Sequence, residues 1–332
     1  MFVGKECINK EMKKKIILFL ALFFSIGKLS AQSAYATFAA LQHDGKLTSF
    51  TGIDALKEAV EAAEDGDVIT LSSGVFNGEC TITKAITLRG AGMTGPDATR
   101  LTGPGRLDVS ITGAEDKTLV IEGIDTGIYG ITCNLNVKSL GQLIVRKCFV
   151  AEFFQIQGVD NIIISNCKIR ELSVNGWSSL NCYNSVVCCS GFGGYVSAVF
   201  KNCFVSAGPM STYEDCICCN MTTYWAGCSA TNTIYALQPS EEVSTSPLHK
   251  NVSYVNSLTS IFDWNQDYSF FDWDFMRSFD YKTKSDVAPS IGIYAGQFPF
   301  SPKLDLPTIK SINVSTQTDA DGKLGIDVEI EN

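Results

Sequence analysis

Short apolar stretches recur along the chain, and each repeats the same order of apolar, polar and turn-forming positions. One eight-residue template describes them, and the central copies begin 19, 18 and 18 residues apart. Alternation of apolar and polar residues is typical of strands, and a recurring period of this size is typical of repeat architectures. The copies begin at Ile86, Leu119, Leu143, Ile162, Leu180, Ala198, Ser211 and, more weakly, Thr223.

The columns of this template predict how each unit is built. The third column is apolar or aromatic, as an inward strand position requires: Leu88, Ile121, Val145, Ile164, Cys182, Phe200, Tyr213 and Trp225. The fifth is rich in residues that tolerate a left-handed backbone and so predicts a bend: Gly90, Gly123, Lys147, Asn166, Asn184, Asn202, Asp215 and Gly227. The sixth is mostly small: Ala91, Ile124, Cys148, Cys167, Ser185, Cys203, Cys216 and Cys228. Since one such unit cannot bury its apolar face alone, the repeat predicts a β-solenoid rather than an antiparallel sandwich.

Segments outside the repeat complete the predicted organisation. Ile53–Glu64 has apolar residues at helical spacing and ends before Gly66, whereas His43-Asp44-Gly45 reads as a hairpin turn. The tail predicts two strands, Thr308–Val314 and Lys323–Ile330. We therefore expect a signal peptide at 1–31, N-terminal strands and a capping helix at 32–66, the solenoid with a C-terminal cap at 67–300, and a strand pair at 301–332.

The first 31 residues predict export. Lys13–Lys15 precede the apolar run Ile16–Ile26, and Leu29-Ser30-Ala31 resembles a cleavage site; Met12 is an alternative start. The run is shorter than the roughly 20 residues of a membrane span, and no other run approaches that length. Residues 1–31 carry six lysines and two glutamates, so their removal lowers the formal net charge from −9 to −13. Such an acidic chain is a poor partner for nucleic acid or an anionic membrane.

Thirteen cysteines, eleven of them between Cys133 and Cys228, raise the question of disulfides or metal. Five occupy the small sixth column, where buried cysteine acts as a small apolar residue. Export permits disulfides between stacked thiols. A zinc site is poorly supported, because spaced CxxC pairs are missing and the chain has only two histidines, His43 and His249. A ladder of free thiols is the favoured interpretation, and the redox state stays open.

The chain resembles the parallel β-helix proteins of the pectate-lyase-like fold, and more narrowly a group of exported bacterial β-helix proteins without an assigned activity. The resemblance rests on the asparagine-rich bend and on four segments: GDVITLSSGVF (66–76), ITKAITLRGAGM (82–93), IGIYAGQFPF (291–300) and DADGKLGIDVEIEN (319–332). It implies an all-β, single-stranded right-handed parallel β-helix with an N-terminal capping helix and a short C-terminal β tail. It also implies a periplasmic, cell-surface or extracellular location in a Gram-negative-type bacterium. It brings no catalytic residues.

Enzymes of this fold typically cleave uronic-acid polymers, which requires outward carboxylate pairs or a base beside a Ca²⁺ site. Arg146 or Lys201 in the outward fourth column could serve as a lyase base, but no carboxylates gather there for Ca²⁺, so no catalytic residue is assigned. The column mixes charges, as cross-strand ion pairs do: Arg89, Glu122, Arg146, Ser165, Tyr183, Lys201, Glu214 and Ala226. An outward apolar stripe in the second column, Val120, Ile144, Ile163 and Val199, predicts cover by a loop. No acid or nucleophile motif adjoins His249, and His43 lies in the predicted turn.

Residues 263–280 combine aromatic and acidic side chains. Aromatic faces beside carboxylates suit sugars, and several Asp oxygens could bind Ca²⁺, although a segment that covers the last coil fits the composition better. The binding candidates are Asp263, Trp264, Asp267, Asp272, Trp273 and Asp274.

Two functions stay open. The first is a non-catalytic exported module that binds a glycan or a surface protein, or serves a structural role. The alternative is a divergent polysaccharide lyase or glycoside hydrolase, which fold analogy alone supports. The sequence assigns no cofactor beyond a weak Ca²⁺ possibility, and it leaves the oligomeric state undetermined.

Overall fold

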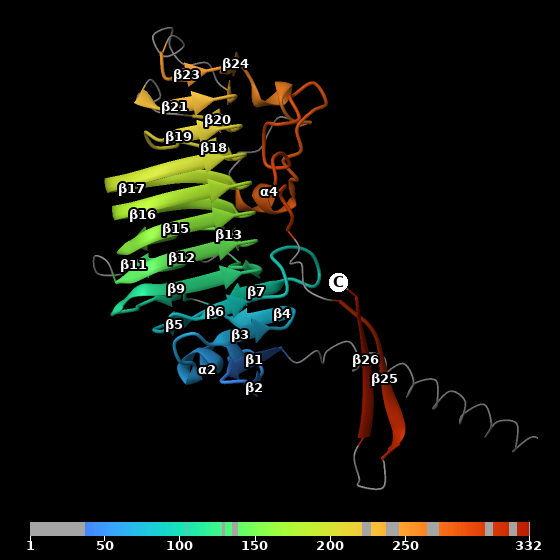
Figure 1. Ribbon diagram of the computed structural model, residues 1–332. Helices are drawn as coiled ribbons and strands as arrows, with labels where there is room; N and C mark the ends of the chain where they lie inside the picture. The colour runs from blue at the N-terminus through green and yellow to red at the C-terminus, as the bar shows by residue number, and fades with distance from the viewer. Residues whose placement is uncertain are drawn as a thin grey trace, which may run out of the picture.

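The computed structural model describes residues 37–103, 105–127, 130–134, 139–220, 227–236, 246–263, 272–302, 308–318 and 324–331. It is 52% strand and 7% helix, which confirms the all-β class. Most strands pair in parallel, and successive turns of the chain stack into a rod (Figure 1). The structure is therefore a parallel β-solenoid, as the repeat predicts.

Three ladders of parallel strands form the walls of this solenoid. The first ladder contains β3 (Val68–Leu71), β6 (Thr87–Arg89), β9 (Ala114–Glu122), β12 (Leu140–Arg146), β15 (Val159–Ser165), the last parts of β16 (Lys168–Tyr183) and β17 (Val186–Lys201), β19 (Thr212–Glu214), β21 (Ser229–Thr231) and β23 (His249–Lys250). The second contains β4 (Gly74–Asn77), β7 (Thr99–Thr102), β10 (Ile124–Asp125), β13 (Phe149–Val150), the first parts of β16 and β17, β18 (Phe204–Ser206), β20 (Ile217–Cys219), β22 (Ile234–Ala236) and β24 (Ser253–Val255). The third contains β5 (Cys80–Ile82), β8 (Leu107–Val109), β11 (Ile131–Asn134), β14 (Phe154–Gln157) and the middle parts of β16 and β17.

The predicted inward column is confirmed from Leu88 to Tyr213. Its residues pair in register along the first ladder, as in Leu88 with Ile121 and Phe200 with Tyr213, and all seven are buried. The weak eighth copy was misaligned. Tyr213 pairs with Ala230, and the bend that follows is Asn232, whereas the predicted Trp225 lies outside the described residues. A longer turn precedes this strand than the template allowed.

The bend column is confirmed at six positions, which all have a positive φ: Gly123, Lys147, Asn166, Asn184, Asn202 and Asp215. Asn232 and Asn251 extend it, with φ of 48° and 52°. Gly90 does not have a positive φ, so glycine is required at this position for a different reason. A Cβ there would collide with the carbonyl oxygen of Gly123 in the next turn. Close backbone approach therefore selects glycine at this position.

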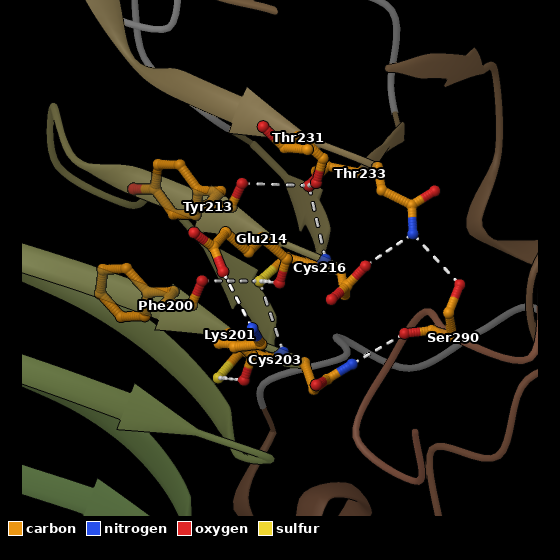
Figure 2. Close-up of polar contacts among 12 residues, drawn as sticks. Phe200, Lys201, Cys203, Tyr213, Glu214, Cys216, Thr231, Thr233 and Ser290 are labelled. Atoms are coloured by element: carbon orange, nitrogen blue, oxygen red, sulfur yellow. Dashed lines mark hydrogen bonds and ion pairs between the residues drawn. The ribbon is translucent and has the colours of Figure 1, made fainter. Parts of the chain in front are cut away.

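The sixth column adds hydrogen bonds to its small size from Cys148 onward, whereas Ala91 and Ile124 have no side-chain donor. The later side chains donate to backbone carbonyls just before the bend, at 3.3 Å from the Cys167 Sγ to Ser165 and at 2.9 Å from the Thr233 Oγ1 to Thr231. Figure 2 shows Cys203, Cys216 and Thr233 in successive turns. Each side chain also reaches a carbonyl oxygen of the preceding turn. Cys, Ser and Thr share this ability, so they alternate in the column. The eleven cysteines whose side chains the structure describes are free thiols.

The N-terminal region begins with the predicted hairpin. β1 (Phe38–His43) pairs with β2 (Lys46–Thr51), and the turn residues Asp44 and Gly45 both have positive φ. β1 also pairs antiparallel with β3. The predicted helix is present as α2 (Ala55–Ala62), whose apolar face packs against β1–β5. Among the described residues, no helix is long and apolar enough to cross a membrane.

His43 is more than a turn residue, because it pairs with a buried carboxylate. Its Nδ1 lies 2.8 Å from Oδ1 of Asp67, and this hydrogen bond raises the pKa of His43 above the ordinary 6.5. A raised pKa means that the folded state binds the proton more tightly than the unfolded chain does. The pair therefore stabilises the fold fully below about pH 6.5 and loses this contribution as pH rises through the folded pKa. We expect the NMR titration midpoint of His43 to lie above 6.5 and to fall in Asp67→Asn; an equal midpoint in both proteins would contradict the pairing.

Part of the expected C-terminal cap lies along the side of the rod and not over the last coil, whereas residues 264–271 of that segment lie outside the described residues. After η2 (Leu258–Ser260), the described residues 272–302, here called the strap, run back along the side of the rod and include α4 (Trp273–Ser278). Figure 1 shows α4 beside the middle strands rather than beyond β24. Strap residues such as Met276, Ile293 and Phe300 share an apolar cluster with outward residues of the second ladder such as Phe149 and Val186. The tail forms the predicted strand pair, β25 (Thr308–Thr318) and β26 (Leu324–Glu331), as a sheet of its own.

Candidate functional site

The asparagine bends hold the strap against the rod. The Asn184 side-chain amide donates to the carbonyl oxygens of Ile293 and Ala295, both at 2.8 Å. In the neighbouring turns, Asn202 donates to the Ser290 carbonyl at 2.8 Å and Asn166 accepts from the Ser301 backbone N–H at 2.6 Å. Figure 2 shows Ser290 facing this column of bends. The bend residues thus have two roles: they permit the left-handed turn, and their amides satisfy the strap backbone.

Lys168 anchors the other end of the strap. Its ammonium donates to the carbonyl oxygens of Met276 at 2.7 Å and Phe279 at 2.6 Å, close to the C-terminus of α4. The aromatic ring of Tyr281 lies 5.5 Å from Nζ. Burial lowers the pKa of Lys168 to about 8, while the negative charge of Asp280 opposes this shift. The amine is therefore mainly protonated at neutral pH.

A groove of about 640 Å³ lies between the end of the strap and the outward face of the first ladder. One wall is the strap segment 297–301; the other is the outward side of β12, β15 and β16 with the bends that follow them. Ile163, from the predicted apolar stripe, is half-buried in this wall. The lining residues are Arg146, Lys147, Ile163, Ser165, Asn166, Tyr183, Gln297, Phe298, Pro299 and Ser301.

The groove combines cations, aromatic rings and neutral hydrogen-bonding groups. Arg146 and Lys147 lie on one wall, and the lining contains no carboxylate. Tyr183 and Phe298 come from opposite walls, and the Phe298 side chain is 68% exposed. Amide and hydroxyl groups fill the space between them. A carboxylate-free, cationic groove on a chain of net charge −9 favours an anionic ligand.

The position of Arg146 is set by the predicted cross-strand pairing. Glu122, which is 2% exposed, pairs in register with both Arg89 and Arg146 and forms ion pairs with each guanidinium. One carboxylate thus serves two arginines and leaves an excess of positive charge at this face. The same column places Lys201 against Glu214 at 3.1 Å.

The predicted binding candidates do not gather around this groove. Asp263 is exposed and pairs with Lys284 at 3.7 Å. Asp272 is the N-cap of α4 and accepts hydrogen bonds from the backbone N–H groups of Asp274 and Phe275, and Asp274 is exposed in the first turn. Trp264 and Asp267, and the side chain of Trp273, lie outside the described residues. Where the chain is described, no three His, Cys, Asp or Glu side chains gather as a metal site would require.

The groove residues could have been found only in part from the sequence. Arg146 and Tyr183 stand in the outward fourth column, but nothing local predicts that the strap covers this position. Phe298 belongs to IGIYAGQFPF, a segment noted for its resemblance alone. A comparison with protein-family models, curated proteins and solved structures finds no match. The site therefore rests on its own geometry.

Proposed function

We propose that this protein is an exported, non-catalytic β-helix that binds acidic polysaccharide in the groove between strap and rod. The observation that carries the proposal is the lining: two cations and two aromatic rings, with no carboxylate. A guanidinium forms charge-assisted hydrogen bonds with carboxylates such as that of a uronic acid. Aromatic rings supply apolar contact area, and the amides and hydroxyls suit sugar hydroxyl groups.

Binding without cleavage fits the groove better than hydrolysis or β-elimination. A glycoside hydrolase needs two carboxyl groups that flank the scissile bond, and the lining offers none. A Ca²⁺-dependent lyase needs carboxylates that hold the cation, and the lining has none. These arguments favour the binding module over the lyase or hydrolase.

The finer features of the fold belong to the same proposal. Right-handed winding is supported by the strong preference of parallel crossovers for that hand. The contacts of α2 with the first strands support a cap that protects the first coil. Export is supported by Lys13–Lys15 and by the apolar run that follows them.

Affinity electrophoresis of the mature protein in gels that contain polygalacturonate, alginate or neutral dextran tests the proposal. We expect retardation by at least one uronate polymer and none by dextran. Arg146→Ala should weaken binding about tenfold or more, because it removes a charge-assisted contact. Glu122 keeps its partner Arg89, so this variant should fold. Lys57→Ala, which removes an exposed cation of α2, is the matched control and should bind as the wild type.

Two results would overturn this function. The first is a wild-type protein that neither uronate polymer retards. The second is the release of reducing or unsaturated ends during incubation, which would establish the enzyme instead.

A further inference from the structure

Two large aromatic side chains stand exposed on neighbouring turns, far along the strand from the groove. Trp177 on β16 pairs in register with Tyr195 on β17; their side chains are 63% and 70% exposed. The rings stack with centroids 4.1 Å apart and an interplanar angle of 28°. Neither residue lies in the eight-residue template, because both stand three positions before a copy begins.

A glycine corner presents this pair. Gly176 and Gly194 pair with each other directly before the two aromatics, with φ of 108° and 80°. Residues with a side chain rarely adopt such φ angles, so the corner requires glycine. The long strands β16 and β17 turn here from the third ladder into the first (Figure 1). The aromatic pair thus marks the edge of the first ladder that lies opposite the asparagine bends.

The pair and the groove lie on the same outward face. Along β16, Ser178, Leu180 and Cys182 are buried, so the alternating positions Trp177, Ser179, Asn181 and Tyr183 point outward. Tyr183 at the far end of this row lines the groove. It lies six positions after Trp177 in the strand, which corresponds to roughly 20 Å. Along β17 the outward row is Tyr195, Ser197, Val199 and Lys201.

We propose that the Trp177–Tyr195 pair is a second contact platform for the same acidic polysaccharide, whose chain runs across the first ladder from the groove. This inference rests on the proposed function. Between the two aromatic ends, the outward row of β16 offers a hydroxyl and an amide, Ser179 and Asn181, and Ser197 follows on β17. Sugar rings need this alternation of apolar faces and hydrogen-bonding groups. A protein partner would favour a contiguous apolar patch, which this row does not provide.

A hollow of about 610 Å³ lies beside Tyr195 on the core side of the strand, where Val196 packs against the core, so it does not extend the path of the ligand. Gly194 and Val196, the neighbours of Tyr195, line it together with Phe192, Pro209 and Met210. The lining carries no charged residue. The groove therefore recognises the charge of the ligand. The platform contributes aromatic ring contacts and lengthens the stretch of polysaccharide that the protein can bind.

The test compares polymer and dimer binding in the same variants. Trp177→Ala/Tyr195→Ala should weaken binding of polygalacturonate or alginate about tenfold or more, because two ring contacts are lost. Binding of the corresponding uronate dimer, measured by calorimetry, should stay within about twofold, since the dimer fills only the groove. Phe298→Ala should weaken both. Leu47→Ala, which removes an apolar side chain that is 70% exposed on β2, is the control and should change neither.

Folding and alternative occupants are checked in parallel. Trp177→Phe keeps a ring and should restore most of the polymer affinity, which a merely unfolded variant could not do. If the wild type and the double alanine variant bound the polymer with equal affinity, the proposed platform would be wrong, whereas the proposed binding in the groove would be unaffected. If the wild type sedimented as a dimer and the double alanine variant as a monomer, the aromatic pair would contact a second copy of the chain. This result would also overturn the proposed platform. Failure of the proposed function would show separately, as a wild type that binds neither polymer nor dimer.

Discussion

Replacing Asn184 with alanine should lower the free energy of unfolding by about 4 kcal/mol. The residue is 4% exposed and has a φ of 45°, a conformation that costs alanine about 1–2 kcal/mol. Its amide is also the donor to the carbonyls of Ile293 and Ala295. Each buried carbonyl group that loses this donor adds about 1–3 kcal/mol to the destabilisation. The melting temperature should fall by about 10 °C, measured by calorimetry or by circular dichroism.

Two further variants separate these contributions. Asn184→Gly keeps the left-handed bend and loses only the amide contacts, so it should cost about 1 kcal/mol less than alanine. Asn251→Ala tests a bend that is exposed, with a φ of 52° and an amide that donates to the Asn232 side chain. It should cost about 1–2 kcal/mol. If Asn184→Ala proved no more destabilising than Asn251→Ala, the strap would not depend on this amide.

Lys168→Met should destabilise the fold by about 3 kcal/mol. Methionine fills a similar volume but leaves the carbonyls of Met276, Arg277 and Phe279 without their ammonium donor. Removing one partner of a buried contact is costly because the other remains desolvated. Lys201→Met is the control: its ion pair with Glu214 is half exposed and should contribute under about 1 kcal/mol. Urea titration of both variants measures the difference, and equal losses would contradict a structural role for Lys168.

The same lysine predicts a dependence on pH. Burial lowers the pKa of Lys168 to about 8, whereas an unfolded lysine titrates near 10.4. Between these values the unfolded chain binds more protons, so the stability of the wild type should rise with pH in this window relative to Lys168→Met. Below pH 8 the difference between the two proteins should be constant.

The residues at the bends show how far a sequence pattern reaches. Positive φ could be predicted at Asn166, Asn184 and Asn202, because the side chain tolerates that conformation wherever it stands. The partners of their amides could not be predicted, since Asn184 and Ile293 are 109 residues apart and follow no common period. A partial signal existed in the seventh template column, where outward residues such as Phe149, Val186 and Phe204 are apolar. Strands that are apolar on both faces are covered on both.

The aromatic platform shows a different limit. The eight-residue template begins three positions after Trp177 and Tyr195, so it does not include them. The register that brings these two residues together is nevertheless present in the sequence. An alignment extended by three positions would have paired them. In the acidic segment 263–280, by contrast, only the composition indicated a binding site, and among the described candidates Asp272 caps α4, Asp263 pairs with Lys284 and Asp274 is exposed.

The sequence by itself determined the solenoid, because inward apolar residues, bends and small hydrogen-bonding residues recur locally and stack with the same neighbours in every turn. It also determined the hairpin turn at Asp44-Gly45 and the strand pair of the tail, which depend on short-range turn chemistry. Only the tertiary structure decided where the chain goes after the last coil. The strap returns along the side because Lys168 and the bend asparagines offer buried donors and acceptors to its backbone. The groove exists because two segments over 100 residues apart meet there, and no local pattern encodes such a meeting.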